Sequence, residues 1–436
     1  MRYAAVLLAL YVVAAGLRVG WVAARYGDPQ RSAELAFPDE EAYWQVARSL
    51  AGAEGLVDEF GFRATYMPAY PAFLALWATG ERPYLAGRLA QAALAALAAP
   101  LAAAVAWRWG RWAEKLPDRV SAPPVQGDTL GERRVLGMAC IAGAIVAFDP
   151  FLTFFSGLFL TEALFAVVLL AAWWFVAGAA RCEEGGRRRD ALGAGALLLV
   201  GMLLRPAAIA VAGAAVLVVV AGRGHSLRRV ILACIIVAVI VGGLFPWAMR
   251  NRQTIGQWRW LTTRGGISLY DGLHAGADGT SDLAHTKTMD AVQGLSETEW
   301  DAWFRARALE DARQDPVRVA RLAGRKFMRT WSLTPNVEEY RGGATAWISA
   351  IFMGGVLATA LIGGWAHRRA VHAWFVLICP VAAVTALHMI FVGSVRYRVP
   401  VLPLIVVLSA AGCVHLLWGR RLASTMGTSA EEKRQR

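Results

Sequence analysis

Residues 37–50 are Phe-Pro-Asp-Glu-Glu-Ala-Tyr-Trp-Gln-Val-Ala-Arg-Ser-Leu, and they come shortly after the first apolar run of membrane length, Tyr3 to Ala24. Asp39 is predicted to be a helix N-cap, because acidic groups in a first turn are favoured by the positive end of the helix dipole. Apolar residues then recur at helical spacing, at Tyr43, Val46, Ala47 and Leu50. We expect a helix along the membrane face; a surface helix with no chemical role would show the same pattern.

The composition indicates a membrane protein rather than a soluble one. The chain has 436 residues, of which 57% are hydrophobic and 18% charged, and its mean hydropathy is +0.43; soluble domains average about 25% charged residues. Apolar runs of membrane length alternate with Arg-rich gaps, which predicts an all-α polytopic membrane protein. The net charge of +13 lies mostly in those gaps. No basic stripe interleaved with aromatic residues runs along a soluble face, so no nucleic-acid partner is expected.

The positive-inside rule predicts about ten transmembrane helices with both termini in the cytoplasm. The apolar run Ala191 to Ala221 decides the count, because it is interrupted by Arg205-Pro206 and has arginines near both ends. Only a hairpin that turns at Arg205 keeps both basic ends inside. The expected regions are an N-terminal transmembrane module (1–249) with a catalytic first outer loop (25–84), an extracytoplasmic region (250–345), C-terminal transmembrane helices (346–420) and a cytoplasmic tail (421–436).

Both outer regions are expected to be mostly helical. In the first loop, the segment Tyr66 to Leu74 is too short to span and suits an interfacial element. In the second, Ser296 and Glu299 form a capping box that opens a helix through Arg313. Asp315-Pro316 opens another, through Trp331. Its basic face, expected either to be solvated or to contact lipid phosphates, consists of Arg318, Arg321, Arg325, Lys326 and Arg329.

The predicted topology gathers ionisable and aromatic residues on the outer face. They are Asp39, Glu40, Tyr66, Tyr70, Glu162, Arg205, Arg250, Arg396, Tyr397 and Arg398. An acid within apolar sequence, as at Glu162, is a functional candidate by default. Each arginine alone is more often a snorkelling anchor, but four on one side with a carboxylate pair suggest a binding site for an anion.

This set of residues suits the transfer of a sugar from a lipid phosphate. The leaving group is already an anion, so it needs cations aimed at its oxygens rather than a general acid. The incoming hydroxyl needs one base, whereas hydrolytic glycosidases need two carboxylates. The second carboxylate would then position the first or hold a divalent metal ion.

The pattern resembles the GT-C type of polyprenyl-phosphate-sugar-dependent glycosyltransferases, which include the protein O-mannosyltransferases of family 39 and the lipid A aminoarabinose transferases. The resemblance is carried, in chain order, by Pro38-Asp39-Glu40 with Tyr43, Tyr66 to Pro71, Glu162, Leu204-Arg205-Pro206, Pro246-Trp247 with Arg250-Asn251, Asp315-Pro316, and Arg396-Tyr397-Arg398 with Pro400 and Pro403. It implies a GT-C-like bundle and an inverting transferase of the inner membrane whose site faces the extracytoplasmic side.

The resemblance also implies roles for single residues. Asp39 would be the catalytic base, with Glu40 beside it. The donor phosphate would be bound by Arg205, Arg250, Arg396, Arg398 and Tyr66. The substrate pocket would be lined by Tyr43, Tyr70, Glu162 and Tyr397. The partners would be a polyprenyl-phosphate-linked sugar and membrane lipids, with the acceptor, which could be a protein, a lipid or a glycan, left open.

One departure from the family concerns metal binding. Several members have Glu-x-Lys-Pro where this chain has Tyr66-Met67-Pro68, so the second acid and the lysine are missing. His274 and His285, with Asp271, Asp278 and Asp282, are an alternative metal site, although an acidic loop with two histidines is more often only a loop. Two other functions compete with the transferase: a transporter or flippase of lipid-linked sugars, and a non-catalytic envelope assembly subunit.

Overall fold

The computed structural model describes residues 2–113, 129–181, 188–222, 225–283, 286 and 289–417, and the regular elements within them are helices. In chain order these are α1 (Arg2–Tyr26), α2 (Pro29–Ser32), α3 (Pro38–Ala51), α4 (Ala69–Ala75), α5 (Pro83–Ala95), α6 (Ala98–Ala113), α7 (Thr129–Ala147), α8 (Pro150–Ser156), α9 (Glu162–Ala179), α10 (Arg188–Leu204), α11 (Ala208–Val220), α12 (Ser226–Ile255), α13 (Gly265–Leu273), η3 (Asp290–Val292), α14 (Glu297–Gln314), α15 (Pro316–Thr330), η4 (Glu338–Tyr340), α16 (Gly343–Ala366), α17 (Val371–Ile390), α18 (Val395–Arg398) and a final helix, Leu402–Leu417. The expected cytoplasmic tail lies outside the described residues.

The chain is a multi-pass membrane protein. Six helical stretches in its described part are long and apolar enough to cross a bilayer, and the bent pair α7 and α8, which meet at 49°, makes a seventh. The predicted count of ten is not confirmed. The shortfall lies in short helices: α11 has 13 residues, or about 20 Å at 1.5 Å per residue, whereas the hydrocarbon core is about 30 Å thick.

The predicted turn at Arg205-Pro206 is present. Arg205, just after α10, forms an ion pair with Glu162 at the start of α9, with Nη1 and Oε1 3.2 Å apart. At the other end of α9, a Cβ built on Gly222, just after α11, would lie 2.6 Å from the carbonyl oxygen of Ala180. The helices α10 and α11 therefore run in opposite directions along α9, and the turn between them brings Arg205 next to a buried acid.

The break between α7 and α8 is stabilised by two charged residues. Asp149 caps α8 by accepting from the backbone N–H groups of Phe151 and Leu152, at 2.8 and 3.2 Å. Arg18, fully buried in α1, donates to the carbonyl oxygens of Val146 and Ala147 at the end of α7. Both carbonyls lie in the last turn of α7, where a helix leaves carbonyl groups without its regular i+4 partners. The break predicted at Asp149-Pro150 is thus confirmed, and the end of α7 is held against α1.

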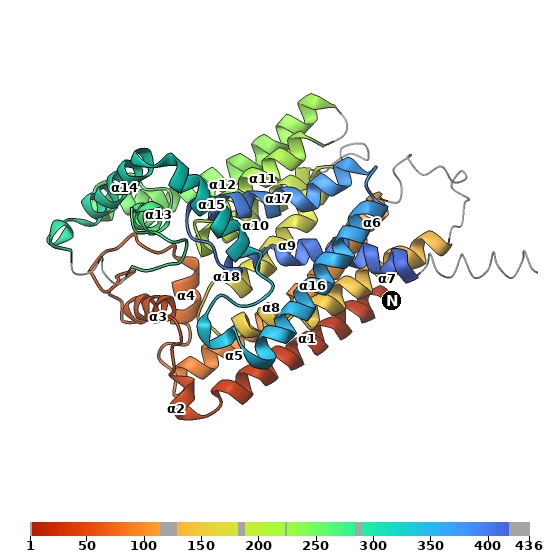
Figure 1. Ribbon diagram of the computed structural model, residues 1–436, viewed down its shortest axis with the longest axis horizontal. Coiled ribbons are helices and arrows are strands. Elements are labelled where there is room, and N and C mark those ends of the chain that lie inside the picture. The colour runs from red at the N-terminus through yellow and green to blue at the C-terminus, as the bar shows by residue number, and fades with distance from the viewer. Residues whose placement is uncertain are drawn as a thin grey trace, which may run out of the picture.

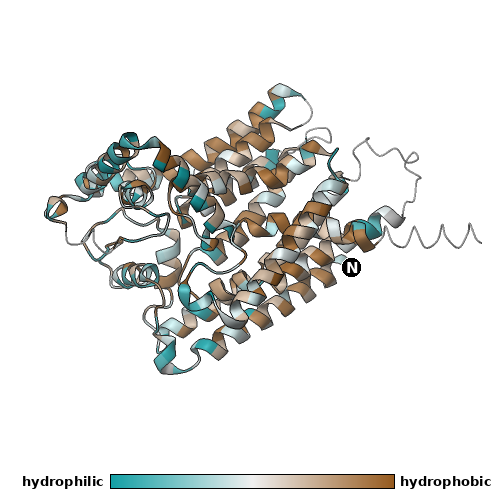
Figure 2. Ribbon diagram, in the orientation of Figure 1, coloured by the Kyte–Doolittle hydropathy of each residue, from teal (hydrophilic) through white to brown (hydrophobic). Residues whose placement is uncertain are grey.

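The shorter helices of the two polar stretches, 25–84 and 250–345, gather at one end of the molecule. In Figure 1, α3, α4, α13 and α14 lie at the left end, beyond the long apolar helices, and Figure 2 shows that this end is the more hydrophilic. Both predicted caps are present: Ser296 N donates to Glu299 Oε2 at 2.9 Å, and Asp315 Oδ1 accepts from Arg318 N at 2.8 Å. α12 runs to Ile255, past the end expected at Met249, so Arg250 lies within a helix.

Candidate active site

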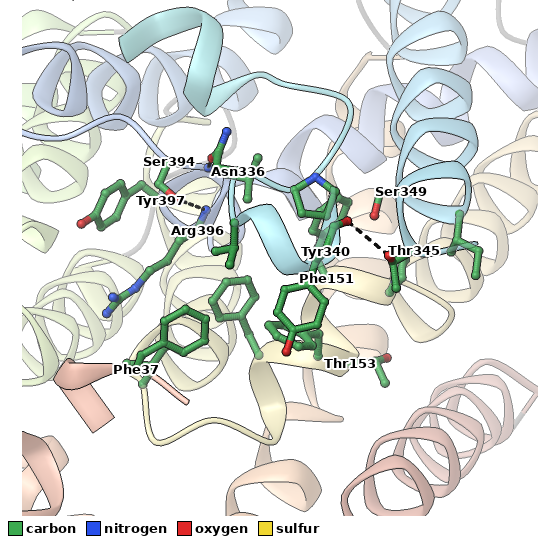
Figure 3. A pocket seen from close by; sticks show the side chains of 18 of the residues that line it. Phe37, Phe151, Thr153, Asn336, Tyr340, Thr345, Ser349, Ser394, Arg396 and Tyr397 are labelled. Carbon is green, nitrogen blue, oxygen red and sulfur yellow. Dashed lines mark hydrogen bonds between the residues drawn. The ribbon is translucent and has the colours of Figure 1, made fainter. Parts of the chain in front are cut away.

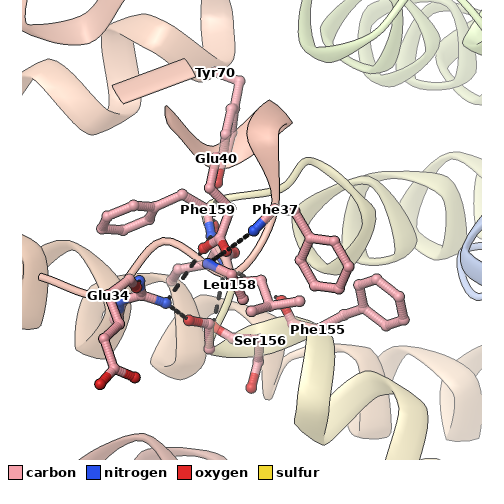
Figure 4. Close-up of polar contacts among 12 residues, drawn as sticks. Glu34, Phe37, Glu40, Tyr70, Phe155, Ser156, Leu158 and Phe159 are labelled. Carbon is pink, nitrogen blue, oxygen red and sulfur yellow. Dashed lines mark hydrogen bonds and ion pairs between the residues drawn. The ribbon is translucent and has the colours of Figure 1, made fainter. Parts of the chain in front are cut away.

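The start of α3 is capped by Glu40 rather than by Asp39. Glu40 is fully buried, and its Oε2 accepts from the backbone N–H groups of Ala36 and Phe37 at 2.8 and 3.3 Å. Its Oε1 accepts from Phe159 N at 2.7 Å and lies 3.4 Å from Arg88 Nη1 (Figure 4). The predicted N-cap was therefore wrong. Pro38 occupies the first helical position, Glu40 reaches back to the free N–H groups, and the Asp39 carboxylate is left for other contacts.

These contacts make Glu40 a structural residue, because they tie α3 to the segment before α9. Glu40→Gln is expected to lower the free energy of unfolding by about 2 kcal/mol, since hydrogen bonds to a charged group contribute about 1.5–3 kcal/mol. The Tm of the purified protein in detergent measures this. Glu41→Gln, an exposed neighbour on the same helix, is the matched control and should leave the Tm unchanged. An equal Tm in both variants would contradict the structural role.

Asp39 joins a chain of four charged side chains that come from four different elements. Its Oδ2 accepts from Arg396 Nη1 at 2.6 Å. Arg396 Nε donates to Glu162 Oε1 at 2.6 Å, and the same oxygen accepts from Arg205 Nη1 at 3.2 Å. The Glu162 side chain is 0% exposed, that of Arg396 is 19% exposed and that of Asp39 is 44% exposed. The acid at the open end of this chain, Asp39, is the one that a substrate can reach.

The pKa of Asp39 lies below its ordinary value. Desolvation by the surrounding groups is the largest single effect and raises it, but the charges of Arg396, Arg264 and Arg205, together with the hydrogen bond from Arg396, lower it by more. Asp39 is therefore ionised at neutral pH, as a general base must be.

Sequence reasoning missed Arg264. Its Nη1 donates to the hydroxyl of Tyr66, its guanidinium lies 4.9 Å from the centre of the Tyr66 ring, and its charge acts on Asp39. Desolvation raises the pKa of Tyr66 to about 12, so this hydroxyl stays protonated. The signal in the sequence was weak, because Arg264 lies in a polar stretch and not at the end of an apolar run.

The tyrosines of the first loop pack side by side behind Asp39. The ring of Tyr43 meets those of Tyr66 and Tyr70 edge to face, with centroids 5.0 and 4.9 Å apart. The Tyr70 hydroxyl donates to Gln91 Oε1 at 2.7 Å and the side chain is fully buried. Tyr70 thus packs behind Tyr43, and its hydroxyl is held by Gln91.

Two of the four predicted arginines are not part of the charged chain. Arg250 donates to the carbonyl oxygen of Arg63 and, at 3.1 Å, to Asn251 Oδ1. Arg398 is fully buried and donates to the carbonyl oxygens of Thr330 and Ser332. Helical geometry explains the second case, because residues two positions apart on a turn such as α18 point to different sides. Arg396 faces Asp39, so Arg398 faces away from it.

An apolar cavity of about 840 Å³ borders Arg396. Its walls come from α1, α8 and α16 and from the segments before η4 and α18. Figure 3 shows Arg396 and Tyr397 at the left, Phe37 below Arg396, and Phe151 and Tyr340 further to the right. Trp21 and Ile348, which also line it, are 40% and 54% exposed on α1 and α16. The cavity is therefore bordered by the surface that these helices present to the bilayer.

The described residues include no group of three or more His, Cys, Asp or Glu side chains that could hold a metal ion. In the loop proposed as an alternative, Asp271 accepts from Ser281 Oγ at 2.6 Å and from Asp282 N at 3.1 Å, and His274 Nδ1 lies 2.8 Å from the carbonyl oxygen of Tyr270. These groups serve the loop itself. His285 lies outside the described residues.

No protein-family model matches the chain, and no curated protein sequence matches it. Among solved structures it is similar to ArnT from Cupriavidus metallidurans in the apo state, with 14% identity over 93% of this chain and 76% of that chain and a TM-score of 0.36. It is also similar to the same protein bound to undecaprenyl phosphate, with 15% identity, coverage of 93% and 77%, and a TM-score of 0.36.

Proposed function

We propose that this chain is a membrane glycosyltransferase that moves a sugar from a polyprenyl-phosphate donor to an acceptor hydroxyl. The observation that carries the proposal is Arg396, which pairs with the accessible carboxylate of Asp39 and also lines an apolar cavity of about 840 Å³. An apolar cavity next to lipid-facing helices suits a prenyl tail, and a guanidinium at its border suits the phosphate.

The reaction follows from the charges. The acceptor oxygen attacks the anomeric carbon on the face opposite the phosphate, and Asp39 takes the hydroxyl proton as the C–O bond to the phosphate breaks. The polyprenyl phosphate leaves with the bonding electron pair, and Arg396, with Arg205 and Arg264 nearby, stabilises the charge on its oxygens. A single displacement inverts the configuration. We infer that this site faces the extracytoplasmic side of the inner membrane, because basic residues such as Arg181 and Arg188 lie at the ends of α9 and α10 that are opposite to Glu162 and Arg205.

Glu162 and Glu40 have supporting roles in this mechanism. Glu162 holds Arg396 and Arg205 together through one oxygen, Oε1, and so fixes the cationic pair. Glu40 caps α3 and directs Asp39 toward the site. The second carboxylate next to Asp39 is thus a positioning group, and the proposed chemistry needs one base only.

Donor binding should also activate the base. In the unliganded site Arg396 is shared between Asp39 and Glu162, and a phosphate that recruits this guanidinium weakens its hold on Asp39. The Asp39 pKa then rises toward the operating pH, where a general base is most efficient. Binding of the correct anion would thereby be coupled to catalytic competence.

A pH–rate profile tests this coupling. The pH at which kcat/KM falls on the acidic side reports the pKa of the base in the free enzyme. The pH at which kcat falls reports the pKa of the base in the bound complex. We expect the limb of kcat/KM below the ordinary Asp value of about 3.9, because the folded pKa is lowered. The ion pair of Asp39 with Arg396 contributes fully above the ordinary Asp pKa of about 3.9. It is lost as the pH falls through the lower pKa that Asp39 has in the folded protein. The acidic fall of kcat is expected at a higher pH than that of kcat/KM, because the bound donor phosphate raises the Asp39 pKa. Coincident limbs would contradict activation by the donor.

The function itself is tested with purified protein in phospholipid vesicles that contain a labelled undecaprenyl-phosphate sugar, taken in turn from a panel of sugars, and a membrane extract as the acceptor source. The expected result is consumption of the donor and release of undecaprenyl phosphate by the wild type. Movement of the labelled lipid across the bilayer without consumption would overturn the transferase and support a flippase. Neither consumption nor movement, with donor binding retained, would support a non-catalytic subunit.

A further inference from the structure

The segment 390–395, which joins α17 to α18, is held by the outer region of the chain through four hydrogen bonds. Lys326 Nζ donates to the carbonyl oxygen of Ile390 at 2.7 Å, and Arg329 Nε donates to that of Gly393 at 3.1 Å. Gly393 N donates to the carbonyl oxygen of Gly279 at 3.4 Å, and Val395 N donates to Asn336 Oδ1 at 2.6 Å. Segment 390–395 therefore has partners along most of its length.

The contact with α15 is close enough to exclude side chains. A Cβ built on Gly393 would lie 2.5 Å from the Cα of Lys326, and one built on Gly272 would lie 2.5 Å from the carbonyl oxygen of Phe391. Both distances are too short for any residue other than glycine without a backbone shift. Segment 390–395 lies directly against α15 on one side and α13 on the other.

Lys326 is the central contact of this arrangement. Its side chain is fully buried in α15, and Nζ donates both to Ile390 and, at 2.8 Å, to the carbonyl oxygen of Gly272 in α13. One ammonium thus joins α13, α15 and the end of α17. Burial lowers its pKa to about 8, with Asp271 opposing this effect and Arg318 adding to it. The basic face of α15 is accordingly not uniformly solvated: Lys326 points inward, whereas Arg321 and Arg325 are exposed.

Segment 390–395 ends where the charged chain begins. Arg396 follows it directly, and Ser394 Oγ accepts from Arg396 N at 3.3 Å. The Tyr397 ring stacks on His388 of α17, with centroids 3.8 Å apart and planes 7° apart. A shift of the segment would move Arg396 relative to Asp39 and Glu162, which approach it from other elements.

We propose that Lys326 is a positioning residue for the transfer reaction, which sets the place of Arg396 by holding segment 390–395 against α13 and α15. This inference rests on the proposed function. A displacement of a catalytic group by about 1 Å can reduce a rate by about 100-fold. The buried ammonium is suited to the task because its hydrogen bonds carry charge and are stronger than neutral ones. The contacts of Lys326 would thus set the distance and orientation of Arg396 relative to the donor phosphate.

Lys326→Met, which keeps the length of the side chain and removes its donors, tests the proposal. We expect kcat/KM for the undecaprenyl-phosphate sugar to fall by about 10- to 100-fold. We also expect weaker binding of undecaprenyl phosphate alone, and partial recovery of both in Lys326→Arg. Arg325→Met, on the exposed side of the same helix, is the control and should behave like the wild type. Unchanged kinetics in Lys326→Met would overturn the inference.

A double-mutant cycle separates positioning from plain stabilisation. If Lys326 acts through Arg396, then Lys326→Met should cause little further loss in an Arg396→Met background. Independent, multiplicative losses would contradict positioning. If Lys326→Met does not fold, Gly393→Ala displaces the segment while leaving the ammonium in place, and the same loss and the same non-additivity are expected. A wild type that neither binds nor consumes the donor would instead contradict the proposed function.

Discussion

Asp39→Asn is expected to reduce sugar transfer by about 1000-fold, within the range of about 10²–10⁴ that general base catalysis contributes. The amide keeps the size of the side chain and can still accept a hydrogen bond from Arg396, but it cannot take the proton of the acceptor hydroxyl. The fold should be retained, because the cap of α3 is provided by Glu40 and not by Asp39. Donor binding should be retained as well, because Arg396 and Arg205 remain paired with Glu162.

The measurement is donor consumption under single-turnover conditions, together with the affinity for undecaprenyl phosphate and the Tm. Glu41→Gln is the matched control, because it removes an exposed acid two residues further along α3 and touches nothing in the site. Turnover within a few-fold of the wild type in Asp39→Asn would remove the base from the proposed mechanism. A loss of both turnover and Tm would assign Asp39 a structural role instead.

Arg396→Met is expected to reduce sugar transfer as much as Asp39→Asn does, but through donor binding and stabilisation of the leaving phosphate. The variant loses the cation at the border of the cavity, so the affinity for undecaprenyl phosphate should fall together with kcat/KM, by about 1000-fold, as for removal of a main group that stabilises the leaving oxygen. It also leaves the buried Glu162 carboxylate with Arg205 as its remaining ion-pair partner. Removing one partner of a buried pair typically destabilises by about 3–5 kcal/mol, and Arg205 should reduce this cost.

Arg396→Lys distinguishes charge from geometry. A lysine restores one positive charge but cannot donate to Asp39 and Glu162 from two nitrogens of one planar group. We expect the Tm to recover more than kcat/KM. Arg321→Met, at an exposed position of α15, is the control for loss of an arginine. Full recovery of kcat/KM in Arg396→Lys would show that charge alone is needed and that the shared guanidinium is not.

Most of the membrane architecture was predictable from local sequence. Apolar runs of sufficient length must form helices in a bilayer, because every backbone polar group needs a partner there. Asp149-Pro150 and Arg205-Pro206 interrupt such runs with a residue that cannot continue the helical hydrogen bonding, so both breaks were visible. The caps at Ser296 and Asp315 depend on spacings of three residues and were equally readable. The number of membrane crossings was harder to predict, because α11 and the helix Leu402–Leu417 are shorter than a membrane-spanning helix.

The composition of the site was only partly predictable. The sequence placed Asp39, Glu162, Arg205 and Arg396 on one face, and the structure joins these four through ion pairs. It also placed Arg250, Arg398 and Tyr70 there, and these contact backbone carbonyls or Gln91 instead. Arg264 was missed.

The sequence by itself determined which segments form long apolar helices, where those helices break and which ionisable residues lie near one face, because these properties depend on hydrophobicity and on neighbours within a few residues. Only the tertiary structure decided which carboxylate caps α3 and which is left accessible. It also decided which arginines share a carboxylate, and that Lys326 of α15 holds the segment before Arg396. Apart from the cap, which uses the nearby backbone of Ala36 and Phe37, these choices depend on hydrogen bonds between residues distant in the sequence, such as Asp39 and Arg396, and no local pattern encodes them.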